Sequence, residues 1–192
     1  MFLKPGNPHL LVVGMSGVKM GDRLVQIGCA DGARMGAIAG KVGLSGRAVV
    51  VVPDAASAAR ANKGAAAAGV LVEIETAPPT RLPVEDAAFD LAIVDETGGL
   101  LATLRPEDRV QAIRELARVL RPGGRVLMIG AEPRGGFGAL LSRTQSGPPF
   151  VASGEAIEAL QADGFKSART LAAREGLVFV EAVKPRTNHV NG

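Results

Sequence analysis

The sequence predicts an α/β fold in which a largely parallel sheet is covered by helices on both faces. Short apolar runs alternate with stretches of helical spacing through most of the chain. The run Arg47–Val52, RAVVVV, is rich in β-branched residues and almost continuously apolar, which is typical of strands buried on both faces. Two later runs, at 167–172 and 177–183, are joined by a short turn, which predicts an antiparallel hairpin.

The elements follow in chain order. The first strand is expected at 23–27 and ends at Gly28. Asp54 is suited to begin an Ala-rich helix, because its carboxylate can accept hydrogen bonds from the first helical N–H groups, and Gly69 is suited to end it. Pro106 favours a helix start. The expected helices cover 33–42, 55–68, 106–120 and 154–162, the other expected strands cover 70–75, 89–94 and 125–129, and a stop and turn (RPGG) is expected at 121–124 and a long loop at 135–149.

The composition excludes several classes of protein. The 192 residues include one Cys, two His, no Tyr and no Trp. One Cys cannot form an internal disulfide, and the Cys and His residues are too few for a Cys/His zinc site, so no metal is expected. Mechanisms that need a tyrosine acid or base are excluded. Without Tyr or Trp, base stacking is disfavoured, and nucleic acid is not an expected partner.

Charge and hydropathy predict a single domain located in the cytoplasm. The net charge is +3, from 22 basic and 19 acidic residues, which is a mild excess. No apolar stretch approaches the roughly 20 residues that span a bilayer, and the first residues do not resemble a secretory signal. The predicted organisation is a short extension at 1–17, one domain at 18–185 and a polar tail at 186–192.

A glycine-containing turn follows the first expected strand. Its sequence, QIGCADG at 26–32, places Gly28 and Gly32 between a strand and a helix, where backbone N–H groups can approach a ligand. The turn does not match the dinucleotide pattern G-x-G-x-x-G, because Ala30 and Ala33 stand at its second and third glycines. From these residues alone, a ligand-binding turn and a purely structural turn both stay open.

Four motifs follow one another along the chain: VQIGCADG, LPVEDAAFDLAIV, ELARVLRPGGRVLMIG and EALQADGF, before the final hairpin. This succession resembles the class I S-adenosylmethionine-dependent methyltransferases, and is most similar to the branch that contains the ubiquinone/menaquinone-biosynthesis methyltransferases. The resemblance implies a Rossmann-like seven-stranded sheet of order 3-2-1-4-5-7-6 with the last strand antiparallel. It also implies S-adenosylmethionine as the cofactor and a small molecule as the methyl acceptor.

The resemblance assigns the cofactor to the carboxyl ends of the first four strands. It implies that the glycine loop passes beside the methionine part, that the second strand ends at the ribose and that the third ends at the adenine. The implied cofactor-binding residues are Gln26, Gly28, Cys29, Ala30, Gly32, Val52, Pro53, Asp54, Thr76, Ala77 and Asp95.

Three of these positions, Gln26, Val52 and Thr76, usually carry an acid in the family. A hydrogen bond to a charged partner is worth about 1.5–3 kcal/mol, so two or three losses would weaken binding by ~10²–10⁵-fold unless another group substitutes. Asp54 could take over the ribose or cap the helix that follows. Two functions therefore stay open: a small-molecule methyltransferase that works by in-line transfer, and a catalytically silent domain of this fold that binds or assembles with a protein partner.

The sequence assigns no catalytic residue. Methyl transfer needs mainly the alignment of the reacting groups, and a general base helps only some acceptors. The segments 97–104 and 131–150 are expected to face the acceptor, and the second could cover a hydrophobic substrate or form a homodimer contact. The candidates for a general base near the expected mouth are Asp95, Glu96, Glu132 and, if the N-terminus folds back, His9.

Overall fold

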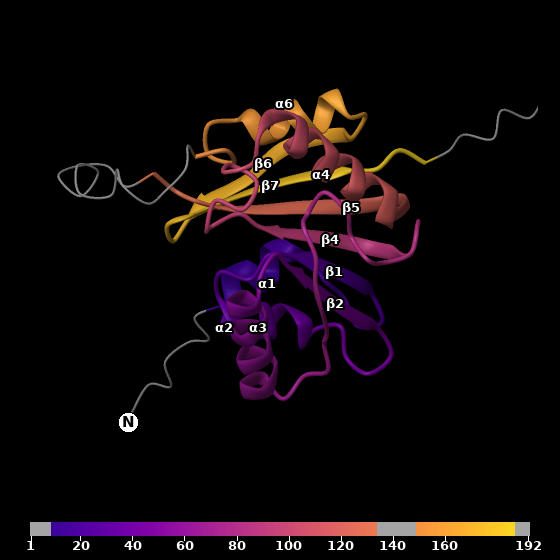
Figure 1. Cartoon of the computed structure of the whole chain (residues 1–192), viewed down its shortest axis with the longest axis vertical. Coiled ribbons are helices and arrows are strands. Elements are labelled where there is room, and N and C mark those ends of the chain that lie inside the picture. The colour runs from indigo at the N-terminus through magenta and orange to yellow at the C-terminus, as the bar shows by residue number, and fades with distance from the viewer. Residues whose placement is uncertain (1–8, 134–148, 187–192) are drawn as a thin grey trace, which may run out of the picture.

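The computed structural model describes residues 9–133 and 149–186 (Figure 1). Its strands form one seven-stranded sheet of order β3-β2-β1-β4-β5-β7-β6. The first five strands pair parallel, and β7 is antiparallel to both of its neighbours, so the predicted order and the antiparallel last strand are confirmed. The strands are β1 (Arg23–Ile27), β2 (Arg47–Val52), β3 (Glu73–Thr76), β4 (Phe89–Asp95), β5 (Leu120–Ala131), β6 (Lys166–Arg174) and β7 (Leu177–Val183).

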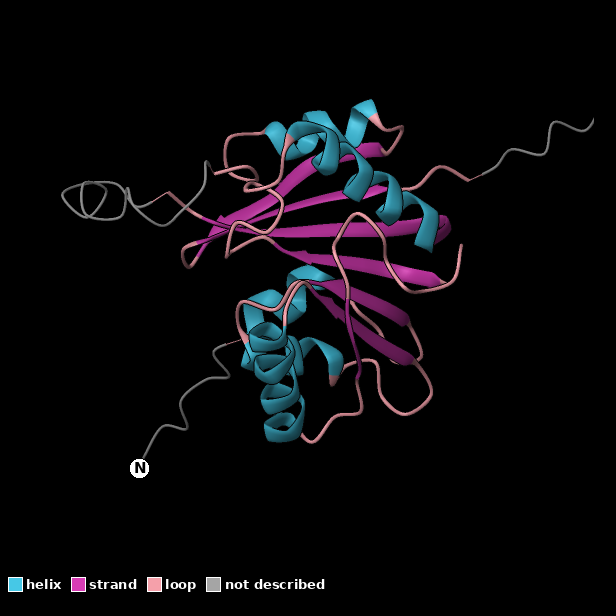
Figure 2. Cartoon of the chain, in the orientation of Figure 1, coloured by secondary structure: helices cyan, strands magenta, loops and turns pink. Residues whose placement is uncertain are grey.

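Helices cover both faces of the sheet (Figure 2). The helices of the described residues are α1 (Leu10–Ser16), α2 (Gly32–Ala39), α3 (Ala55–Ala68), α4 (Pro106–Val119) and α6 (Glu155–Ala162). One core cluster joins α4 and α6 to one face of the sheet, and a second joins α1, α2 and α3 to the other. Residues that alternate along a strand divide between the clusters: Val25 belongs to the first, whereas Leu24 and Val52 belong to the second.

The strand order creates a natural place for a site. β1 lies between β2 and β4, so the connection after β1 runs to one side of the sheet and the connection after β4 runs to the other. In parallel α/β sheets, ligands bind outside the carboxyl ends of the strands where the order reverses in this way. The glycine loop after β1 and the segment after β4 meet at this point, which Figure 1 shows near the middle of the sheet.

Two elements differ from the expectation. Helix α1 lies within the segment that was expected to be a short extension, and its seven residues are too few for periodicity to reveal it. It packs onto the domain, since Val12 is buried and Arg125 Nη2 donates to the Ser16 carbonyl at 2.6 Å. The predicted stop at 121–124 is wrong, because β5 already begins at Leu120 and the 121–124 segment continues pairing through hydrogen bonds with Lys184.

The other boundaries agree to within a few residues. β3 begins at Glu73 rather than at residue 70, and α2 ends at Ala39 rather than at residue 42. Apart from residue 149, the long loop expected at 135–149 lies outside the described residues. Among the helices in 9–133 and 149–186, none is long and apolar enough to cross a membrane.

Candidate functional site

The glycine loop joins β1 to α2 in a conformation that its first glycine makes possible. Gly28 has φ +81°, which L side chains rarely adopt. A Cβ atom at Gly28 would lie 2.9 Å from Leu100 Cδ2 and 3.1 Å from the Asp95 carbonyl oxygen. The N–H of Gly28 donates to the Val51 carbonyl at 2.8 Å, so the loop turns over the end of the sheet. The loop therefore requires glycine here for its backbone angle and for the space around it.

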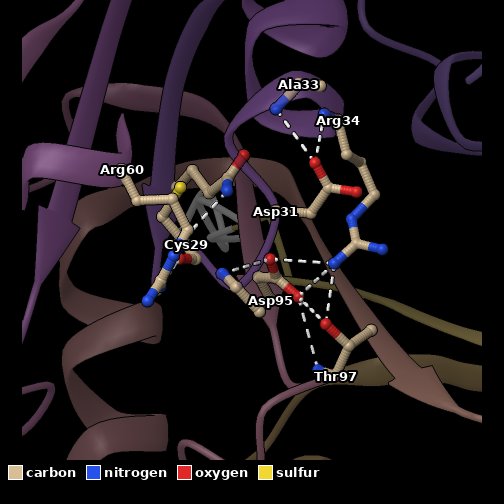
Figure 3. Close-up of polar contacts among 10 residues, drawn as sticks. Cys29, Asp31, Ala33, Arg34, Arg60, Asp95 and Thr97 are labelled. Atoms are coloured by element: carbon tan, nitrogen blue, oxygen red, sulfur yellow. Dashed lines mark hydrogen bonds and ion pairs between the residues drawn. The ribbon is translucent and has the colours of Figure 1, made fainter. Parts of the chain in front are cut away.

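Asp31 begins helix α2. Its Oδ1 accepts hydrogen bonds from the N–H groups of Ala33 at 2.9 Å and Arg34 at 3.0 Å. These are two of the N–H groups that have no partner inside a helix, so Asp31 serves as the N-cap. Figure 3 shows this carboxylate directed at the N–H groups of Ala33 and Arg34, so it is occupied by the helix.

Glycines let α3 press directly on the start of α2. A Cβ atom at Gly32 would overlap the Arg60 carbonyl oxygen, and one at Gly64 would lie 2.7 Å from Gly32 Cα. From the same helix α3, Arg60 Nη1 donates to the Cys29 carbonyl at 2.6 Å. The position of the glycine loop is thus set in part by α3.

Asp95, the last residue of β4, is the centre of the polar contacts in Figure 3. It is 3% exposed. Arg34 Nη2 donates to Oδ1 and Oδ2 at 2.9 and 3.0 Å, and the Ala30 N–H donates to Oδ2 at 2.9 Å. Thr97 donates to Oδ1 from its hydroxyl at 2.6 Å and from its N–H at 3.3 Å. We call these residues, Asp95, Arg34, Thr97 and the Ala30 N–H, the Asp95 network.

Gln26 lies beside the glycine loop, and only one of its two amide atoms, Nε2, forms a hydrogen bond. Its Nε2 donates to the Gly28 carbonyl at 2.9 Å, and the residue is only 2% exposed. Within the described part of the chain, its Oε1 is the buried side-chain polar atom that has no hydrogen-bond partner. A buried acceptor without a partner is costly, so Oε1 is suited to receive a donor from a bound molecule or an ordered water.

The end of β2 offers no carboxylate to the site. Val52 is fully buried in the core beside α1, α2 and α3. Asp54 is exposed and caps α3, since Oδ1 accepts the Ser57 N–H at 2.7 Å. That hydrogen bond holds the pKa of Asp54 below its usual value. Of the two roles that the sequence left open for Asp54, the structure therefore shows the helix cap, and Pro53 before it is exposed.

Thr76 and Ala77, at the end of β3, line an open cavity of about 910 Å³. Leu82, Glu115 and Arg118 line its other side. The Ala77 N–H donates to the Val52 carbonyl at 3.0 Å, so this end of β3 remains tied to the end of β2. The structure thus brings the predicted third-strand positions to a cavity, whereas the predicted loop positions gather around Asp95 and Gln26.

The remaining candidates for acid–base chemistry are held by other contacts or lie elsewhere. Glu96 accepts the N–H groups of Leu101 at 2.6 Å and Ala102 at 2.8 Å, and burial raises the pKa of its carboxyl. Glu132 is exposed and follows β5, and its N–H donates to the Gly176 carbonyl. Burial also raises the pKa of the Cys29 thiol to about 11, so a thiolate is disfavoured at neutral pH.

A family model described as a methyltransferase domain matches residues 25–128, which is more than half of the chain. The chain belongs to this methyltransferase family. The match begins in β1 and ends in β5, so it includes the glycine loop, the Asp95 network and the cavity at the end of β3.

Curated relatives of this methyltransferase domain are similar over part of their length. The 27-O-demethylrifamycin SV methyltransferase of Amycolatopsis mediterranei is 37% identical over 122 residues, covering 61% of this chain and 41% of that protein. The O-methyltransferase resE of Aspergillus sclerotiorum is 31% identical over 106 residues, covering 55% and 38%. The chain therefore spans less than half the length of these two relatives.

Solved structures share the fold at low sequence identity. A SAM-dependent methyltransferase from Aquifex aeolicus superposes with a TM-score of 0.73 at 18% identity, covering 92% of this chain and 89% of that one. The [4+2]-cyclase SpnF superposes with a TM-score of 0.68 at 20% identity, covering 92% and 79%. Because SpnF is described as a cyclase, the likeness of fold alone does not establish methyl transfer.

Sequence patterns did not single out three residues of this candidate site: Arg34, Arg60 and Thr97. One signal was present for Arg34, which stands four residues before the buried Ile38 on the face of α2 that packs on the core. A charged side chain on such a face needs a buried partner. The sequence could not say that the partner was Asp95, which is 61 positions away.

Proposed function

We propose that the chain is an S-adenosylmethionine-dependent methyltransferase that acts on a small molecule. The observation that carries the proposal is the unpartnered Gln26 Oε1, buried directly below a glycine loop that the family uses for the cofactor. An amide oxygen in this position fits the ammonium group at the amino-acid end of S-adenosylmethionine, which can donate to it. The class of acceptor is supported by a relative whose name gives it a small-molecule substrate, the 27-O-demethylrifamycin SV methyltransferase.

The residues present fit the three parts of the cofactor unequally. The glycine loop and Gln26 fit the amino-acid end, and Thr76 and Ala77, which stand where the resemblance puts the adenine, line an open cavity. Val52 at the end of β2 cannot form a hydrogen bond to a ribose hydroxyl. We therefore infer that binding is weaker than where a carboxylate takes both ribose hydroxyls, because that contact is charge-assisted and bidentate.

When bound, S-adenosylmethionine supplies a methyl group that is already activated on a sulfonium sulfur. The chain then has to orient the acceptor and limit the access of water. Asp95 and Glu96 both accept backbone N–H groups, so neither carboxylate is placed to take a proton from an acceptor. We infer that the acceptor is a group that reacts without a protein base at this position.

Calorimetric titration with S-adenosylhomocysteine tests the proposal. Heat of binding should appear at ligand concentrations below millimolar, and Gln26→Leu, which removes the Oε1 acceptor, should weaken it by about tenfold or more. A matched control is Gln161→Leu on α6, far from the loop in sequence, which should bind as the unaltered protein does. No heat near millimolar ligand with the unaltered protein would refute cofactor binding.

A second candidate is favoured by the end of β2. Val52 is fully buried, so the position that the resemblance assigns to the ribose lacks an acid, and Asp54, two residues later, caps α3. These features suit a silent methyltransferase-fold domain that binds or assembles with a protein partner. The same titration separates the two functions, since only the enzyme requires the cofactor to bind.

A further inference from the structure

Asp95 joins three parts of the chain that surround the expected ligand position. Its carboxylate receives the Ala30 N–H from the glycine loop, the Arg34 guanidinium from α2 and the Thr97 hydroxyl from the segment after β4. The side chains of Asp95 and Arg34 are 1% and 10% exposed. A buried carboxylate needs compensation of this kind, and here every compensating group belongs to the rim of the site.

The segment after β4 is held against the glycine loop as a consequence. The Leu100 side chain reaches Gly28, since a Cβ atom there would lie 2.9 Å from Leu100 Cδ2. A Cβ atom at Gly98 would lie 3.5 Å from the Ala30 Cβ, an ordinary van der Waals contact. The Asp95 network therefore sets both the direction of the Ala30 N–H and the distance between the two loops.

This arrangement bears on the neutral residue at the end of β1. An acid at the position of Gln26 would place a charge below the loop, but Gln26 has only a neutral amide, whose Nε2 donates to the Gly28 carbonyl. The full negative charge that contacts a backbone N–H of the 28–30 turn comes from Asp95, on the adjacent strand. The carboxylate that holds the loop is thus supplied from β4, as one member of an ion pair with Arg34.

We propose that Asp95, paired with Arg34, is the positioning residue of the glycine loop: its carboxylate holds the loop from β4, where Gln26 offers only a neutral amide, and prepares the loop for the amino-acid end of the cofactor. The effect on cofactor affinity rests on the proposed function, whereas the effect on loop order does not. Asp95 is not a general base in this arrangement, because its oxygens are filled by donors from Ala30, Arg34 and Thr97.

The test uses the full chain and a double variant, Asp95→Leu with Arg34→Met. Replacing both members of a buried ion pair by apolar residues often preserves stability, whereas removing one leaves the other charge unpaired. The double variant should therefore melt closer to the unaltered protein than Asp95→Leu does, although the N–H groups of Ala30 and Thr97 lose their acceptor. Its amides at 28–32 should nevertheless exchange hydrogen faster, and its affinity for S-adenosylhomocysteine should fall about 10- to 100-fold, the loss expected for one charge-assisted hydrogen bond.

Asp90→Asn is the matched control. Asp90 is also on β4 and pairs with an arginine, Arg121, at 2.7 Å, but it lies at the opposite end of the strand. This variant should leave exchange at 28–32 and the affinity unchanged. If the double variant does not fold, Asp95→Asn tests the same claim, because it keeps the shape and removes the charge; it should speed exchange at 28–32 and weaken binding about tenfold.

The outcomes are distinguishable. If the unaltered protein does not bind S-adenosylhomocysteine, the proposed function fails and hydrogen exchange alone decides the role of Asp95. Protection at 28–32 that is lost in the double variant or in Asp95→Asn, and kept in Asp90→Asn, supports the positioning role. Protection and affinity that both survive in the Asp95 variants would overturn it and leave the pair with a purely structural role.

Discussion

Replacing Gly64 by Ala tests how closely the glycine loop depends on α3. A Cβ atom at Gly64 would lie 2.7 Å from Gly32 Cα and closer still to the Gly32 carbonyl. Carbon atoms pack at about 3.5–4.0 Å, so α2 and α3 must separate by on the order of 1 Å. These atoms are backbone, so the strain cannot be relieved by turning a flexible side chain, and Gly32 is the first residue of α2.

The expected cost follows from two opposing effects. Overpacking in a tight contact costs about 1–3 kcal/mol, and the backbone contacts place Gly64→Ala near the upper end. Ala in a helix interior is favoured over Gly by about 1 kcal/mol. The net loss is then about 2 kcal/mol. For a chain of this size, each kcal/mol shifts the melting temperature by about 2–4 °C, so a fall of about 4–8 °C is expected.

Gly14→Ala is the matched control. Gly14 is also inside a helix, α1, and a Cβ atom there would meet nothing within 4 Å. Only the gain in helix propensity remains, so the melting temperature should rise by about 2–4 °C. Differential scanning calorimetry of both variants decides the matter. A Gly64→Ala protein that melts at or above the unaltered temperature would refute the inference that direct backbone contact sets the spacing of α2 and α3.

Four further predictions concern titratable groups. Asp54→Ala should lower the melting temperature, and Asp54→Ser should restore much of the loss, without either changing S-adenosylhomocysteine affinity; a large loss of affinity would instead assign Asp54 to the ribose. Because burial raises the pKa of Glu96, the contribution of its carboxyl to the free energy of unfolding falls as pH rises. Urea unfolding should therefore show Glu96→Gln becoming more stable relative to the unaltered protein as pH rises from about 4 to about 7. Glu115 should show the opposite pH dependence, because its partner Arg118 lowers its pKa. Glu115→Gln should reduce the free energy of unfolding at about pH 7, and this loss should shrink as pH falls towards about 3. The same pH trend in both variants would contradict both assignments. The Cys29 thiol, with its pKa raised to about 11, should resist a disulfide reagent at about pH 8 until the protein is unfolded; rapid labelling of the folded protein would show that the thiol is accessible.

The sheet could be predicted because each strand carries its own signal. RAVVVV at Arg47–Val52 is apolar and β-branched because both faces of β2 are covered. The short turn before Leu177 indicates the final hairpin. The strand order came from the succession of motifs and not from any strand alone. Helix α1 escaped prediction because two turns are too short to establish a period.

The site was predictable only in part. Gln26 and Gly28 could be proposed because they stand at the end of a strand and just after it in a recognisable motif, whereas the role of Asp95 depends on a partner that comes from another part of the chain. A pattern along the sequence cannot show that a carboxylate is already filled by three other residues. The same holds for Asp54, where the sequence allowed a cap and a ribose contact, and the structure shows the cap through the Ser57 N–H.

The two ends of the site bear differently on the two candidate functions. A buried amide oxygen without a partner, under a loop that only glycine can form, is hard to explain by stability alone, because replacing it with an apolar side chain would remove the cost. That feature favours a ligand at the amino-acid end. Val52, in contrast, is explained fully by its place in the core and gives no reason to expect a ribose contact. If S-adenosylhomocysteine is held mainly through its amino-acid end, homocysteine should displace it measurably and adenosine should displace it poorly. A silent domain that binds no such ligand would show neither effect.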